Sequence, residues 1–74
     1  MLKEVIVGIS ARNQLKGKIT EIILGDVMAH ITVRVGQDLI ESVITRKSAD
    51  ELALKTGDDV TVTVKATEVM IAKD

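Results

Sequence analysis

The sequence contains no cysteine and no aromatic residue, and its only histidine is His30. A disulfide framework is therefore excluded, and one histidine without cysteine is too few to build a zinc cluster. These absences matter because a chain of 74 residues forms a single domain whose isolated core gives only a small free energy of unfolding. Association with other chains is the remaining reinforcement, so we expect an oligomer.

The charges of the chain are balanced, with ten lysine and arginine residues against eleven aspartate and glutamate residues and a net charge of −1. Any attraction for an anion must therefore come from a local pocket and not from the whole surface. The missing phenylalanine, tryptophan and tyrosine also remove the stacking surfaces with which small barrels bind single-stranded nucleic acids. Nucleic acid is thus not an expected partner.

Signals for export or membrane insertion are also missing. No apolar run approaches the ~20 residues that a membrane-spanning helix needs. Residues 1–9 show no cleavage pattern of a signal peptide. The sequence therefore predicts a cytoplasmic location and no membrane partner.

Apolar residues alternate with polar ones along most of the chain, which is the pattern of half-buried β-strands. Three apolar rows are expected to form the core: Val5, Val7, Ile9 and Ala11; Val27, Ala29, Ile31, Val33 and Val35; and Val60, Val62, Val64 and Ala66. The alternation breaks at the run Ile22, Ile23 and Leu24. This break indicates either a strand that is covered on both sides or a bulge.

Glycine-containing pairs mark the expected turns between strands: Gly25-Asp26, Gly36-Gln37 and Gly57-Asp58. Ser48 followed three residues later by Glu51 is a capping box, which predicts one helix of about two turns before the last hairpin. Short strands in a meander with one small inserted helix are typical of a five-stranded Greek-key barrel of the OB type. We therefore predict an all-β fold of this kind, with residues 1–74 in one domain.

Polar and charged side chains crowd the junction between the first two expected strands, in the segment Ser10-Ala11-Arg12-Asn13-Gln14-Leu15-Lys16-Gly17. Such a segment is either a solvated loop or a binding site. Its residues resemble, position by position, the opening motif of the molbindin family and of related molybdate-binding domains in transport ATPases and regulators. Residues 44–52 and 64–71 resemble the same family in order and spacing. The resemblance thus covers nearly the whole chain, apart from a longer lead over residues 1–7.

The resemblance implies a function and an assembly. A free-standing copy of this unit is similar to the storage members of the family, so we expect intracellular binding, storage and homeostasis of molybdate or tungstate. The family forms dimers by strand exchange and joins three dimers, which implies a hexamer with the anions held between subunits. The leading apolar strand from Val5 to Ile9 can complete a neighbour's sheet as easily as its own.

Molybdate and tungstate are tetrahedral dianions without a proton at neutral pH, so a site for them should consist of hydrogen-bond donors with positive charge nearby. The chain offers such donors: Arg12 and Lys65 with their charge, the side chains of Ser10, Asn13, Thr45 and Ser48, and the backbone N–H of Ala66. The resemblance implies that one subunit provides Ser10, Arg12, Lys65 and Ala66, and that its neighbour provides Thr45 and Ser48. Many relatives have serine at the position of Ala66, so this chain lacks one hydroxyl there. No side chain is expected to coordinate the metal atom directly.

Several of these residues also have a purely structural interpretation. Ser48 is explained equally well as the cap of the helix, and Lys65 as a solvated residue on the outer face of a strand. His30 is explained more simply as a surface or subunit-contact residue than as a ligand. Met28 and Met70 are most simply packing residues.

Other classes of protein fit the sequence less well. Residues 49–60 also resemble the helix-then-hairpin element of DNA-binding regulators of the swapped-hairpin type, but the chain has no basic face for phosphates. A bare oligomerisation module, whose cations form only salt bridges, is the third alternative. An enzyme is not expected, because the chain has no cysteine nucleophile, no glycine-rich phosphate loop and no histidine paired by motif with a carboxylate.

Overall fold

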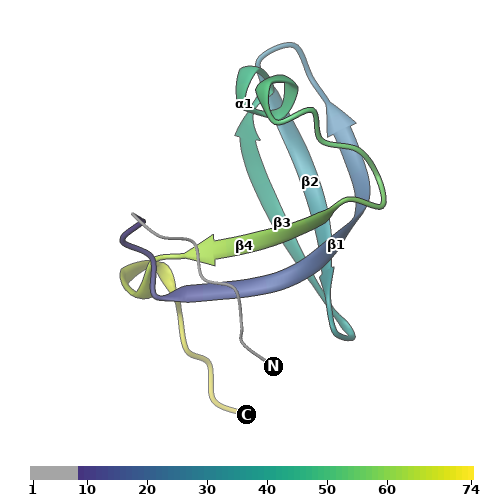
Figure 1. Ribbon diagram of the computed structural model, residues 1–74. Helices are drawn as coiled ribbons and strands as arrows, with labels where there is room; N and C mark the ends of the chain where they lie inside the picture. Colours follow the sequence, from purple (N-terminus) through teal and green to yellow (C-terminus); the bar gives the residue numbers. More distant parts are fainter. Residues whose placement is uncertain (1–8) are drawn as a thin grey trace.

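The computed structural model describes residues 9–74, which form four strands and two short helices (Figure 1). The elements are β1 (Asn13–Leu24), β2 (Met28–Val35), β3 (Asp38–Thr45), α1 (Arg46–Glu51), β4 (Asp59–Val64) and the 3-10 helix η1 (Ala66–Glu68). The prediction of a mainly β fold with one helix before the last strand is confirmed. No helix in this part of the chain is long and apolar enough to cross a membrane.

The sheet has the strand order β3-β2-β1-β4, and every neighbouring pair is antiparallel. β1 pairs with two strands in succession, because its residues 13–18 face β4 and its residues 18–24 face β2. Figure 1 shows β1 following β4 and then curving towards the β2–β3 hairpin. The curl brings the sheet round towards a barrel and leaves β3 and β4 as its two edges.

Most of the expected first strand lies outside the described residues. Residues 9–11 lie outside any strand, and Val5 and Val7 lie outside the described residues. Residues 9–74 contain four strands, and the predicted fifth strand stays a prediction. Alternation predicts an extended segment, but it does not predict whether a strand with free hydrogen-bonding groups lies beside that segment.

The break in the alternation of β1 is a bulge. The register with β2 shifts between Ile19 and Glu21, so Thr20 is the extra residue. The alternative of a strand covered on both sides is wrong, because Ile23 is 55% exposed and Leu24 is 51% exposed. After the bulge, the half-buried Ile22 still packs against the core, as the buried Ile19 does before it.

The core is small, and it consists of five buried side chains with half-buried residues packed around them. The five are Ile19, Ala29, Ile31, Val33 and Ala49. The middle of the second predicted row is thus confirmed, whereas Val27 lies in the turn before β2 and is 73% exposed. The predicted packing role of Met28 and Met70 is wrong within this chain, because they are 44% and 93% exposed.

Gly17 lies where β1 passes close to β2. A Cβ atom on Gly17 would lie 2.5 Å from the backbone oxygen of Arg34 and 2.6 Å from Cγ1 of Val33. Both distances are too short for a carbon atom, so a larger residue would push the strands apart. The missing side chain therefore permits the close approach at which β1 passes from one partner strand to the other.

Candidate functional site

The first group of predicted site residues lies where β1 begins and β4 ends. Asn13, the first residue of β1, pairs with Val64, the last residue of β4. Arg12 and Lys65 are the next residues outward from this pair, and both are exposed. The antiparallel register therefore brings these two cations to the same end of the ladder, although they are far apart in the sequence. We call Ser10, Arg12, Lys65 and Ala66 the cationic half-site.

Two side-chain amides hold the backbone beside the cationic half-site. Nδ2 of Asn13 donates to the carbonyl oxygen of Val64 at 3.2 Å, and Nε2 of Gln14 donates to the carbonyl oxygen of Ala11 at 3.3 Å. The first bond ties β1 to β4 at the last pair of the ladder. One N–H of the Asn13 amide is thus used within the protein, and the second is left for the predicted role as a donor to the anion.

Lys65 and Ala66 lie in a tight turn and not in a strand. β4 ends at Val64, Lys65 is the N-cap of η1, and Ala66 is the first residue of η1. The interpretation of Lys65 as a residue on the outer face of a strand is therefore wrong, and so is the placement of Ala66 in an apolar strand row. The hydrogen bonds of η1 run from Glu68 N to Lys65 O at 2.9 Å and from Val69 N to Ala66 O at 3.4 Å. The N–H groups of Ala66 and Thr67 precede these bonds and have no acceptor inside the helix.

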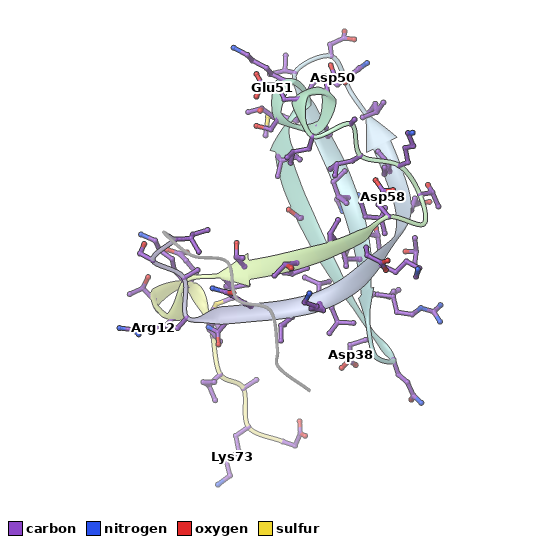
Figure 2. The ribbon with its side chains drawn as sticks, viewed as in Figure 1. Arg12, Asp38, Asp50, Glu51, Asp58 and Lys73 are labelled. Atoms are coloured by element: carbon purple, nitrogen blue, oxygen red, sulfur yellow. The ribbon has the colours of Figure 1, made fainter. Side chains whose placement is uncertain are left out.

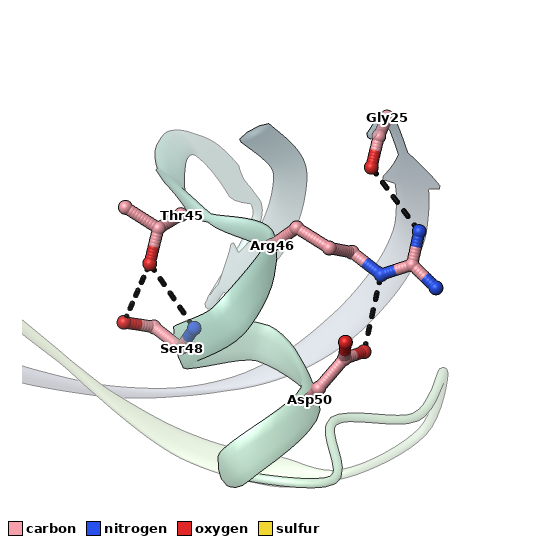
Figure 3. Close-up of polar contacts among 5 residues, drawn as sticks. All are labelled: Gly25, Thr45, Arg46, Ser48 and Asp50. Atoms are coloured by element: carbon pink, nitrogen blue, oxygen red, sulfur yellow. Dashed lines mark hydrogen bonds and ion pairs between the residues drawn. The ribbon is translucent and has the colours of Figure 1, made fainter. Parts of the chain in front are cut away.

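The second group of predicted site residues lies where β3 passes into α1. Thr45 Oγ1 accepts a hydrogen bond from the backbone N–H of Ser48 at 3.1 Å and donates to Ser48 Oγ at 2.8 Å (Figure 3). Thr45 is therefore the N-cap of α1, and the capping role predicted for Ser48 is wrong. We call Thr45 and Ser48 the hydroxyl half-site. One of their two hydroxyl protons is used between them, so one proton remains to donate to a ligand.

Arg46 lies between the two hydroxyl residues in sequence, but its side chain extends away from them (Figure 3). Its Nε forms an ion pair with Oδ1 of Asp50 at 3.1 Å, and its Nη1 donates to the carbonyl oxygen of Gly25 at 3.1 Å. Its backbone N–H donates to the carbonyl oxygen of Val27 at 2.7 Å. Sequence reasoning gave Arg46 no role of its own, although its spacing of four residues from Asp50 is the signal of an ion pair on a helix.

The two half-sites lie at opposite ends of β1. The cationic half-site is beside Asn13, whereas Thr45 pairs with Met28 beyond the pair of Leu24 with Ala29. Figure 2 shows Arg12 at one end of the molecule, and Asp50 and Glu51, which belong to α1, at the other. The structure thus brings Arg12 and Lys65 to the same end of the β1–β4 ladder and joins Thr45 to Ser48, but it does not bring the two half-sites together within one chain.

Two surface hollows lie outside the cationic half-site. One, of about 600 Å³, is lined by Lys16, Gly17, Asp59, Val60 and Thr61. The other, of about 510 Å³, borders Thr45 and Arg46 and is lined also by the carboxylates of Asp26, Asp50 and Glu51. Arg46 and Lys47 also line it, so its charged groups keep a net negative charge that does not suit a dianion by itself. Among residues 9–74 there is also no cluster of three histidine, aspartate or glutamate side chains that suits a metal ion.

His30 is the third residue of β2, two residues along the strand from Met28, which is the cross-strand partner of Thr45. Its Nε2 atom is 3.0 Å from Oε1 of Glu41 on β3, and its side chain is 34% exposed. The predicted surface position is confirmed, because the imidazole lies on the outer face of the sheet and its recorded partner is a carboxylate. Its predicted alternative role in a subunit contact stays a prediction.

Comparison with known protein sequences gives consistent matches over most of the chain. Residues 9–71 match the model of the TOBE domain. The chain is 45% identical over 64 residues to molybdenum-pterin-binding protein 2 of Clostridium pasteurianum, and the match covers 85% of this chain and 94% of that protein. Molybdenum-pterin-binding protein 3 of the same organism is 42% identical over 64 residues, with the same shares covered.

Solved structures give the same result. A molybdate-binding protein from Sporomusa ovata superposes with a TM-score of 0.87 at 40% identity, which covers 90% of this chain and 100% of that one. MopII from Clostridium pasteurianum, in an apo form, gives 0.83 at 43% identity and covers 89% and 100%. The cytoplasmic molybdate-binding protein ModG, solved with molybdate bound, gives 0.77 at 38% identity, over 81% of this chain and 43% of ModG. The chain therefore belongs to the TOBE domain family and, within it, to the molybdenum-pterin-binding proteins.

Proposed function

We propose that this protein binds molybdate or tungstate and stores it in the cytoplasm without transforming it. The observation that carries the proposal is the position of Arg12 beside Lys65 at the end of the β1–β4 ladder. In the described part of the chain neither cation takes part in an ion pair. Two neighbouring positive charges repel each other, and a bound dianion replaces this repulsion by attraction to both.

The groups around these cations are hydrogen-bond donors, which suits an anion that carries no proton. Ser10 offers a hydroxyl group, Asn13 its second amide N–H, and Ala66 its backbone N–H at the start of η1. Molybdate and tungstate accept hydrogen bonds at all four oxygen atoms. Phosphate at neutral pH keeps a proton that needs an acceptor, and the guanidinium, ammonium and backbone N–H groups of this site cannot accept it.

The remaining donors of the site come from a neighbouring subunit in this proposal. Thr45 and Ser48 lie at the far end of β1 from Arg12, so one chain cannot place both half-sites on the same anion. A partner chain can place its hydroxyl half-site against the cationic half-site of the first. Each anion then contacts charge from one subunit and neutral hydroxyl donors from the other.

Assembly into a hexamer, as a trimer of dimers, belongs to the same proposal. It is supported by apolar side chains that this chain leaves exposed near the cationic half-site, namely Leu15 at 39%, Val69 at 47%, Met70 at 93% and Ile71 at 89%. It is supported also by the sheet edges β3 and β4, which no strand of residues 9–74 covers, since either can accept a strand from a neighbour. A strand exchanged in this way would provide the fifth strand of the Greek-key barrel.

Isothermal titration calorimetry with molybdate, tungstate, sulfate and phosphate in parallel tests the function. We expect tight binding of molybdate and tungstate and much weaker binding of phosphate, for which the proton has no acceptor. Sulfate also carries no proton, and we expect its smaller size to weaken its contacts with donors spaced for a larger anion. Equal affinity for phosphate and molybdate would contradict the proposal, and the absence of binding to all four would favour a bare oligomerisation module.

A further inference from the structure

The hydroxyl half-site lies at the start of a helix that is too short to be stable without contacts to the rest of the chain. α1 has six residues and buries only Ala49. An isolated helix of this length is not stable in water, so the contacts that α1 makes with the rest of the chain set its orientation. The orientation of Ser48, in its first turn, depends on the same contacts.

Arg46 makes the contacts that fix the first turn of α1 to the β1–β2 turn. Its backbone N–H reaches the carbonyl of Val27, and its guanidinium group bridges the carbonyl of Gly25 and the carboxylate of Asp50. A guanidinium group donates in two directions from one rigid plane, which suits a bridge between two elements. The bridge therefore links the backbone before β2 with both ends of α1.

The direction of the Arg46 side chain separates this role from anion binding. The guanidinium group points towards Gly25 and Asp50, whereas the Thr45–Ser48 pair lies on the other side of the helix start (Figure 3). The charge of the guanidinium is also largely balanced by the Asp50 carboxylate at 3.1 Å. Neither feature suits a residue that binds a dianion directly.

We infer that Arg46 and Asp50 are positioning residues, which hold the hydroxyl half-site in the orientation that a bound oxyanion needs. This inference rests on the proposed function, because it assigns a part in that site. Its most specific consequence is that Asp50, a carboxylate, strengthens the binding of an anion. It does so by fixing Arg46, even though its own charge repels the ligand.

Simple charge attraction predicts the opposite result at Asp50, which makes a direct test possible. If Arg46 and Asp50 acted through charge alone, Arg46→Ala would weaken anion binding, Arg46→Lys would restore it, and Asp50→Ala would strengthen it. If they act by positioning, all three substitutions weaken binding, because lysine cannot donate in two directions from one plane. The two explanations therefore predict opposite changes in affinity for Asp50→Ala. They also differ in whether Arg46→Lys restores the affinity that Arg46→Ala loses.

The experiment is calorimetric titration of the assembled full-length protein with molybdate at about 0.15 M salt, where charges on the surface are well screened. Lys47→Ala is the matched control for Arg46→Ala, and Glu51→Ala is the matched control for Asp50→Ala. Each control removes the same charge from the neighbouring residue, and within residues 9–74 neither Lys47 nor Glu51 takes part in an ion pair. Thermal melts without ligand show whether each variant is folded at the temperature of the titration.

We expect Arg46→Ala and Arg46→Lys to weaken molybdate binding by about five- to tenfold, the size of one charge-assisted hydrogen bond lost. Asp50→Ala should weaken it by about threefold, since one of the two side-chain contacts of Arg46 remains. Both controls should change it by less than about twofold. Tighter binding by Asp50→Ala, full rescue by Arg46→Lys or unchanged binding by Arg46→Ala would overturn the inference. Absence of molybdate binding by the wild-type protein would instead overturn the proposed function.

Discussion

The two half-sites are built in different ways. Arg12 and Lys65 follow directly from paired strand ends, and the ladder together with the Asn13 side chain fixes their backbones. Thr45 and Ser48 belong to a six-residue helix whose orientation depends on a few side-chain contacts. The cations of the proposed site thus adjoin paired strand ends, and its neutral donors stand on a short helix that is held by local contacts.

This difference suits what each half-site has to do. Charge attraction acts over several ångströms and tolerates small errors of position, but it requires that two like charges be held together at a cost in free energy. A hydrogen bond from a hydroxyl group weakens steeply with distance and angle. The hydrogen bonds between β1 and β4 keep Arg12 near Lys65 against their repulsion. The Thr45 cap and the Arg46 bridge fix the orientation of Ser48.

The largest effect is expected from a substitution in β1, the strand that connects the two half-sites, because it disturbs both of them at once. Gly17→Ala should lower the free energy of unfolding by about 3 kcal/mol or more, because the new Cβ atom overlaps backbone and cannot be relieved by a side-chain rotation. Gly36→Ala is the control, since Gly36 has a φ of 63° but nothing within 4 Å of its Cβ position. Gly36→Ala should lower the free energy of unfolding by only about 1 kcal/mol. Urea denaturation measures the free energy of unfolding of both variants. An equal decrease in the two would contradict the close approach at Gly17.

Removing charge from the cationic half-site should have the next largest effect. Arg12→Ala should weaken molybdate binding by more than about 1.5 kcal/mol, as expected when a charge-assisted hydrogen bond is lost. The melting temperature of the ligand-free protein should stay the same, because Arg12 is exposed. Arg34→Ala, which removes an exposed arginine from β2, is the control for net charge. Unchanged affinity in folded Arg12→Ala protein would place the anion elsewhere.

Removing one hydroxyl should have a smaller effect, because a neutral hydrogen bond is weaker than a charged one. Ser48→Ala should weaken molybdate binding by about 1 kcal/mol. Thr45 remains the N-cap through its own hydroxyl and the backbone N–H of residue 48, so α1 should stay folded. Calorimetry together with circular dichroism checks both statements. A loss as large as that of Arg12→Ala would mean that the two half-sites do not differ as described.

A mixture of the two variants tests whether the half-sites that meet belong to different chains. When Arg12→Ala and Ser48→Ala chains are refolded together, each mixed dimer has one site with both defects and one site with neither. About a quarter of all sites should then bind molybdate with wild-type affinity, if the chains pair at random. Titration of the mixture should show this tight fraction, and titration of either variant alone should not. If the mixture has no tight fraction, both half-sites of each site come from one chain.

The smallest expected effect is a gain. Ala66→Ser adds a hydroxyl group at the start of η1, beside a backbone N–H that already points outward from the turn, and should tighten molybdate binding by about 0.5 kcal/mol. Thr67→Val is a suitable comparison, because it changes the next residue without adding a donor. Weaker binding by Ala66→Ser would show that the position tolerates no side chain larger than alanine.

The local features of the fold follow from the sequence because they depend on neighbouring residues. Alternation of apolar and polar residues predicted β2 and β4, and turn residues predicted where the chain reverses, including the turn before β3. The cap was assigned to the wrong residue, because Thr45 and Ser48 are both hydroxyl residues and either can begin a capping motif. Only the backbone where β3 ends decides between them, and Thr45 has the extended conformation of an N-cap.

The candidate site also has features that follow from the sequence and features that depend on the tertiary structure. The sequence by itself determined which hydrogen-bond donors the chain owns and that it has no cysteine, and it predicted that Arg12 and Lys65 supply the charge. Only the tertiary structure decided that Arg12 lies beside Lys65, that Lys65 starts a 3-10 turn, and that Arg46 turns away from the hydroxyl pair. The physical reason is that cross-strand neighbours depend on register. The register of β1 follows from packing along its whole length, including the bulge at Thr20 and the close approach at Gly17, and not from the residues of the site.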